Sequence, residues 1–266
     1  MMKSFCCILL LLFFLPELYP QDFSIGFFPE KKIYSRYYAD ALSHQFSLSK
    51  HLESSEWFGN IGAQIAFSNL IINEHLFQFS VGATSFNTLI KKPGHIQVYT
   101  VDYLVDFFLD SQIYKGLIGR FILGHLSAHY SDDGIIELNN IPISYVRDYT
   151  GFHIQDSLPF VNGKFYGGFF YNFHNEPVDE HFTYQLGMDG GLPVLKEIFL
   201  FTAIDIKIKS EVNYGTVQSF QFGAVFPYRN KMSFRIAYTH RRGFEERGQL
   251  FDRKDIKNTI GLFLDF

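Results

Sequence analysis

The chain ends on the stretch Asn258-Thr259-Ile260-Gly261-Leu262-Phe263-Leu264-Asp265-Phe266. Apolar side chains recur there at every second position, at Ile260, Leu262, Leu264 and Phe266. A two-residue repeat is that of a β-strand, because successive side chains of a strand point to opposite faces of its sheet. We therefore predict that the chain closes on a strand with one strongly apolar face.

The same alternation recurs upstream, most clearly in residues 198–209. One set of alternate positions there is mostly apolar: Ile198, Leu200, Thr202, Ile204, Ile206 and Ile208. The intervening set carries the charges of Asp205, Lys207 and Lys209. An apolar face opposite a charged one suits a barrel whose outer surface meets lipid and whose lumen is polar.

Turn signals divide the rest of the chain into segments of strand length, among them Pro93-Gly94, Asn162-Gly163 and Asn175-Glu176-Pro177. The predicted strands are 57–67, 75–87, 95–108, 113–131, 141–155, 161–174, 181–191, 197–211, 217–228, 233–243 and 257–266. Barrel strands have ~9–11 residues and single-chain barrels use even strand numbers. We predict an all-β fold, an antiparallel transmembrane β-barrel of roughly 12 strands, in one domain over 22–266.

The start of the chain has the pattern of a secretory signal peptide, over residues 1–21. Lys3 precedes an apolar run from Cys6 to Leu15, which Pro16 and Pro20 break. The run is too short for a membrane-spanning helix, which needs ~20 apolar residues. Its removal takes away both cysteines, so we expect no disulfide, no thiolate metal site and no cysteine nucleophile. We also expect no cofactor. An exported chain closing on an apolar alternation and a terminal aromatic is predicted to reside in the bacterial outer membrane.

That closing strand resembles the recognition signal read by the bacterial outer-membrane assembly machinery. The resemblance makes Ile260, Leu262, Leu264 and Phe266 the expected assembly signal, with the assembly machinery and outer-membrane lipids as partners. A net charge of −4 and the absence of a basic block argue against nucleic acid as a partner. The oligomeric state stays open. Residues 22–56 are a periplasmic lead-in or a lumen segment, and 23–50 could add another strand. The polar part 29–56 suits a plug, a short helix inside the lumen or a loop.

Candidate chemistry lies in the stretch from Gly124 to Gly134. His125 and Ser127 are two residues apart, so a strand places the imidazole beside the hydroxyl on one face. This is the pairing that activates a serine nucleophile. Asn139 follows at a position where the returning strand is expected to begin, and it would complete a His-Ser-Asn set on the outer face. His129 and Ser131 form an alternative pair.

The pair His125-x-Ser127 with Asn139 is similar to the arrangement of outer-membrane phospholipase A. The stretch His129-Tyr130-Ser131-Asp132-Asp133-Gly134 resembles the His-x-Ser-Asn region of the lipid A 3-O-deacylases, although Asp132 stands in place of the asparagine. Both resemblances imply ester hydrolysis at the outer face of a barrel. A metal site from His125, His129 and the two aspartates is not predicted, because residues four apart on a strand lie ~13 Å from each other.

A broader resemblance covers most of the mature chain. It rests on an ordered set of short motifs: Phe28-Pro29, Tyr38-Ala39-Asp40, His125-Leu126-Ser127-Ala128-His129, Tyr145-Val146-Arg147-Asp148 and Arg247-Gly248-Gln249-Leu250-Phe251. This set looks like a family of uncharacterised bacterial outer-membrane proteins, catalogued as a domain of unknown function. It implies an envelope barrel and supplies no reaction.

Three functional hypotheses follow. The leading one is a non-enzymatic outer-membrane barrel, structural or with a narrow channel. The second is a serine acyl-ester hydrolase acting on phospholipid or lipid A. The third is a soluble periplasmic β-protein that binds an apolar ligand. The first two differ in whether the histidine, the serine and the asparagine meet on the outer face.

Overall fold

A computed structural model describes residues 22–195, 198–228 and 232–265. The predicted signal peptide and Phe266 lie outside the described residues. The strands of the described part are β1 (Phe23–Phe27), β2 (Phe46–His51), β3 (Glu56–Ile72), β4 (His75–Lys92), β5 (His95–Tyr114), β6 (Leu117–Tyr130), β7 (Tyr145–Leu158), β8 (Gly163–Glu176), β9 (Phe182–Leu195), β10 (Ile198–Lys209), β11 (Gly215–Tyr228), β12 (Met232–Phe244) and β13 (Lys254–Asp265). One short helix, α2 (Asp132–Leu138), follows β6.

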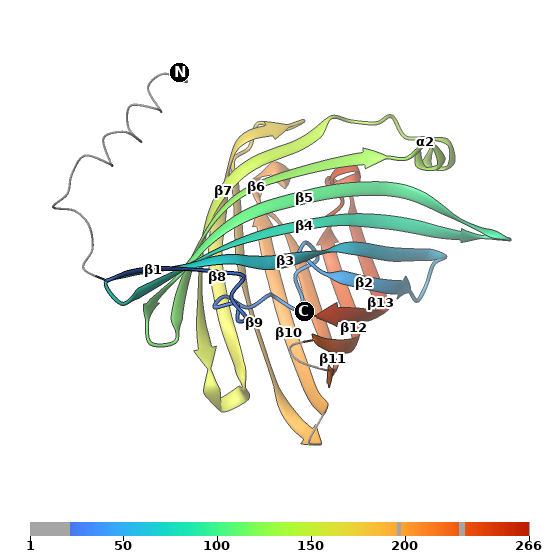
Figure 1. The fold of residues 1–266 in the computed structure, drawn as a ribbon. Helices are drawn as coiled ribbons and strands as arrows, with labels where there is room; N and C mark the ends of the chain where they lie inside the picture. The colour runs from blue at the N-terminus through green and yellow to red at the C-terminus, as the bar shows by residue number, and fades with distance from the viewer. Residues whose placement is uncertain (1–21, 196–197, 229–231, 266) are drawn as a thin grey trace, which may run out of the picture.

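Strands β2 to β13 close into an antiparallel barrel (Figure 1). Each strand pairs with its neighbour in sequence, and β2 pairs with β13 to complete the ring. The prediction of a twelve-stranded barrel is therefore confirmed for the described part of the chain. The first strand, β1, pairs with residues 68–72 of β3. It lies along the same edge of β3 as β2, which pairs with residues 57–60.

The alternation along β10 has the predicted consequence. Leu200 and Ile204 are exposed on the outer surface, whereas Asp205 and Lys207 are buried in the lumen. The range 113–131, predicted as one strand, instead spans the end of β5, a turn and β6. Gly116 in that turn has a φ of 87°, which favours glycine. No helix in the described ranges has both the length and the apolar character needed to cross a membrane.

Residues 28–45 connect β1 to β2 and run through the lumen as a plug (Figure 1). The Tyr37 ring stacks on Tyr166 of β8 at a centroid distance of 3.5 Å. The His44 ring makes hydrogen bonds of 2.9 Å, through Nδ1 with Thr84 Oγ1 of β4 and through Nε2 with Asp106 Oδ2 of β5. A Cβ at position 82 would lie 2.2 Å from the His44 ring, so glycine in the wall makes room for the plug.

The loop that joins β12 to β13, residues 245–253, folds into the lumen at the end of the barrel that carries α2. Gln249 donates hydrogen bonds of 2.7 Å to the Ala128 carbonyl and 2.8 Å to the Ile143 carbonyl. Gly248 packs so closely on Tyr145 that a Cβ there would lie 2.2 Å from the ring. The plug and this loop together occupy much of the lumen, and a cavity of about 100 Å³ remains between the plug, the loop and the barrel wall.

Candidate functional site

His125 and Ser127, the first pair that the sequence predicts, lie on the outer face of β6, near its end at Tyr130. Phe121, Leu123 and His125 point outward with Ser127, whereas Leu126 and Ala128 are buried in the barrel. The expected common face of His125 and Ser127 is therefore present. It places an imidazole and a hydroxyl where the apolar outer surface reaches the α2 end.

The partner of His125 is an aspartate on the neighbouring strand. Asp148 of β7 is directly opposite His125 in the strand register. Its Oδ1 accepts a hydrogen bond of 2.6 Å from His125 Nδ1. An imidazole that donates from Nδ1 keeps Nε2 as its basic nitrogen, so this contact sets the tautomer that a general base needs.

A second histidine holds the other oxygen of the same carboxylate. His174 of β8 donates from Nδ1 to Asp148 Oδ2 at 2.8 Å. The register between β7 and β8 shifts between Asp148 and Tyr149, because Phe173 is an extra residue on β8. This bulge turns His174 to the outer face, and bulges commonly re-aim a side chain in this way. His125, Asp148 and His174 thus form a row across β6, β7 and β8.

Ser127 is half-buried on this face, opposite Tyr103 of β5 and Val146 of β7. Within the described ranges, neither Ser127 Oγ nor His125 Nε2 has a hydrogen-bond partner. Two residues apart on one face of a strand, their Cα atoms are separated by roughly 7 Å. Side-chain rotation brings such groups together, and catalytic hydrogen bonds often tighten only when substrate binds.

Asn139 does not join this row, and the expectation that it begins the returning strand is wrong. It ends α2 in the left-handed conformation, with a φ of 47°, and β7 begins six residues later at Tyr145. The cause is the helix itself. Ser131 accepts from the Gly134 N–H at 3.1 Å as its N-cap, and Asp132 and Asp133 fill its first turn.

The alternative pair of His129 and Ser131 also separates. His129 lies outward, with its ring 6.0 Å from that of Tyr103. The Ser131 hydroxyl already makes structural hydrogen bonds, because it caps α2 and donates to the Val98 carbonyl. No group of three or more histidine, cysteine or acidic residues in the described ranges is placed to hold a metal ion.

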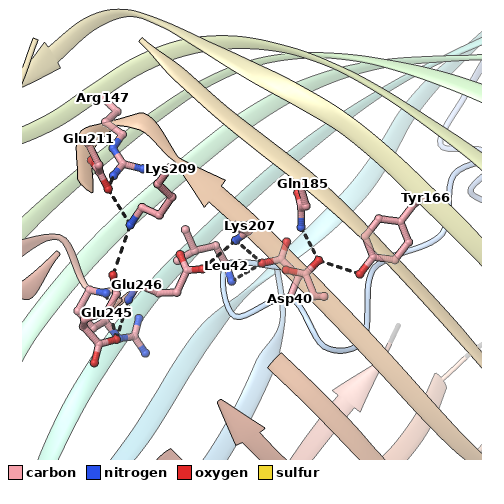
Figure 2. A network of polar contacts seen from close by, with 12 residues as sticks. Asp40, Leu42, Arg147, Tyr166, Gln185, Lys207, Lys209, Glu211, Glu245 and Glu246 are labelled. Carbon is pink, nitrogen blue, oxygen red and sulfur yellow. Dashed lines mark hydrogen bonds and ion pairs between the residues drawn. The ribbon is translucent and has the colours of Figure 1, made fainter. Parts of the chain in front are cut away.

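The lumen holds a separate network of buried charges (Figure 2). Lys207 lies 2.6 Å from Asp40 of the plug and 3.4 Å from Glu246 of the β12–β13 loop. Lys209 lies 2.7 Å from Glu211, which also pairs with Arg147. These ion pairs join the plug, the loop and the barrel wall inside the lumen.

Comparison with solved structures finds the same fold in a lipid-degrading enzyme. The calcium-bound dimer of the outer membrane phospholipase from Salmonella typhi is 13% identical, with a TM-score of 0.55 over 90% of this chain and 95% of that one. An active-site mutant of outer membrane phospholipase A from Escherichia coli is 14% identical, with a TM-score of 0.52 over 95% and 93%. At these identities the likeness is one of fold. No family model matches the chain, and no curated protein matches it.

Proposed function

We propose that this protein is a bacterial outer-membrane β-barrel that hydrolyses acyl esters of membrane lipids at its outer surface. The observation that carries the proposal is the 2.6 Å contact of His125 Nδ1 with Asp148, beside Ser127 on the same face. In this assignment Ser127 is the nucleophile, His125 is the base and Asp148 orients the imidazole. The carboxylate takes the role that the sequence had assigned to Asn139.

The proposed reaction has two steps. Ser127 Oγ attacks the carbonyl carbon of the ester while its proton passes to His125 Nε2. The bond to the alcohol breaks, and the alcohol leaves with that proton. Water then attacks the acyl-serine with His125 again as base, which releases the fatty acid and restores the free hydroxyl.

The placement of the row supports a substrate that arrives through the membrane. Phe121 and Leu123 lie below His125 on the same exposed face of β6, so an acyl chain in the bilayer meets apolar side chains before the polar row. The same outward apolar surface argues against the soluble periplasmic alternative. An ester carried in a lipid reaches Ser127 without entering the lumen.

The plugged lumen favours one second candidate, a sealed barrel with a structural role. Ion pairs hold the plug and the loop to the barrel wall, and they support a closed lumen better than a narrow channel. Membership in the family of uncharacterised outer-membrane proteins stays a prediction. We also propose that the assembly machinery recognises the β13 end, where Ile260 and Leu262 face outward.

The experiment that tests the proposal measures acyl release by the purified, folded protein in detergent and in vesicles of outer-membrane lipid. Separate arms with labelled phospholipid and labelled lipid A identify the substrate. A lipid phosphonate that traps serine nucleophiles, followed by peptide mass analysis, locates the nucleophile without knowledge of the substrate.

The matched variants are Ser127→Ala and Ser85→Ala, since Ser85 is a non-buried serine on β4. We expect Ser127→Ala to remove release and labelling and Ser85→Ala to leave both unchanged. Wild-type protein that releases no acyl group and takes no label at Ser127 would leave the sealed structural barrel as the better account.

A further inference from the structure

A small polar cavity of about 40 Å³ lies inside the lumen, away from the outer row. It lies where the plug residues 38–41 meet the inner faces of β11, β12 and β13 and the inward-folded β12–β13 loop. Its lining includes the cationic side chains of Arg241, Arg247 and Lys257. The proposed hydrolysis makes no use of these residues.

Two of these cations have hydrogen-bond donors without partners. In the described ranges, Arg241 Nε and Arg247 Nη1 are buried atoms that no acceptor contacts. Arg247 is only 6% exposed, and its single side-chain hydrogen bond is a long one of 3.4 Å from Nη2 to Asn60. Buried polar groups are almost always paired, so these donors point to an acceptor that the protein itself does not supply.

The charges around the cavity are also unbalanced. Glu245 pairs with Lys257, and Asp40 pairs with Lys207 at 2.6 Å. In the described part of the chain, no carboxylate lies within ion-pair distance of Arg241 or Arg247. Burial lowers the pKa of Arg247; the charges of Asp102 and Glu245 act against this, the charge of Arg241 adds to it, and the pKa stays below its ordinary value. An unpaired guanidinium in such a place is costly, and a bound anion removes the cost.

The rest of the lining suits an anion. Thr239 Oγ1 accepts from Gln221 at 2.8 Å, which leaves its own proton free to donate. Ser49 and Thr259 add further hydroxyl groups. A water molecule needs ~10–15 Å³ of such space, so a cavity of about 40 Å³ holds a monatomic anion together with one or two water molecules.

We infer that this cavity binds a halide ion, in practice chloride, between Arg241 and Arg247. The ion would join the plug, the β12–β13 loop and the barrel wall through one shared counter-charge. Chloride would then be part of what keeps the lumen closed, whether or not the outer surface is catalytic.

The first test is diffraction from crystals of the folded protein grown in bromide. We expect an anomalous peak in the cavity near Arg241 Nε and Arg247 Nη1. Water alone at this position, with no anomalous signal, would overturn the inference.

The second test is thermal unfolding in detergent, in sodium chloride or bromide against sodium gluconate at equal ionic strength. We expect the unfolding midpoint to rise by about 2–4 °C for each tenfold increase in halide, once the halide concentration exceeds the dissociation constant. Arg247→Gln should lose this halide dependence. Arg242→Gln should keep it, because the exposed Arg242 instead donates to Gln218 at 2.8 Å. Equal midpoints for the wild type in halide and gluconate would also overturn the inference, and the wild-type measurements decide it even if a variant fails to fold.

Discussion

Asp148 Oδ1 accepts a hydrogen bond of 2.6 Å from His125 Nδ1 across the β6–β7 pair, on the outer surface of a barrel whose lumen holds a plug. The contact joins an imidazole and a carboxylate on a surface where the other outward side chains nearby, such as Phe121 and Leu123, are apolar. A carboxylate in that position orients the imidazole and stabilises its protonated form during proton transfer. The next two predictions follow from this geometry.

Asp148→Ala should lower kcat of acyl release by about 10²–10⁴-fold, because His125 loses the partner that sets its tautomer. The KM for lipid should change little, since Asp148 does not contact the acyl chain in the proposed reaction. Steady-state kinetics on lipid in mixed micelles measure both. Thr150→Ala on the same face of β7 is the control, and an equal loss in that variant would indicate a general effect on the strand.

His174→Ala should have a smaller effect, about tenfold on kcat, because Asp148 keeps its contact with His125 after losing the 2.8 Å bond to His174. His174 is a positioning residue in this scheme. Its removal should also displace the pH profile of kcat, which a purely structural role would leave in place. His174→Asn, which retains a donor, should recover part of the rate. An unchanged pH profile and rate in His174→Ala would remove His174 from the scheme.

The barrel and its two faces could be predicted from the sequence because a two-residue repeat reports directly which side chains share a face. Asp205 and Lys207 alternate with Ile204 and Ile206, and the structure buries the charged pair. Outward placement of His125 and Ser127 followed from the same rule. Such a pattern acts within one strand, so it is informative without any knowledge of the neighbours.

The partners across strands could not be predicted in this way, because register depends on the connections. Residues 132–138 form α2, so β7 begins later in the sequence than expected. As a result Asp148, and not Asn139, lies beside His125. A signal for this helix was present, since Ser131 precedes two aspartates as an N-cap does. The bulge at Phe173, which turns His174 outward, has no such signal in the sequence.

Asp40→Asn should destabilise the protein by about 3–5 kcal/mol, because it leaves Lys207 with only the 3.4 Å contact to Glu246. The double variant Asp40→Asn, Lys207→Met should recover much of this loss, since it removes the unpaired charge. Urea unfolding in detergent measures both, and planar-bilayer conductance reports whether the plug has loosened. Equal stability of the single and double variants would contradict the role of this ion pair in holding the plug.

The pH dependence of stability should report on Glu245, which anchors the β12–β13 loop through Lys257. Burial alone would raise the pKa of Glu245, but the charge and hydrogen bond of Lys257 outweigh it and hold the pKa at about 2, against 4.5 ordinarily. A carboxylate with a lowered pKa in the folded protein contributes stability above pH 4.5, and loses it as the pH falls toward 2.

The urea midpoint of the wild type should therefore fall as the pH is lowered from about 5 to about 2. The corresponding loss of unfolding free energy is up to ~3 kcal/mol. Glu245→Gln should lower the midpoint at pH 7 and flatten this acid limb, because an amide has no proton to gain. Glu137→Gln is the control: its carboxylate pairs with Lys92 at 3.0 Å on the exposed surface, where water screens the charge. An acid limb in Glu245→Gln as steep as that of the wild type would place the responsible carboxylate elsewhere in the lumen.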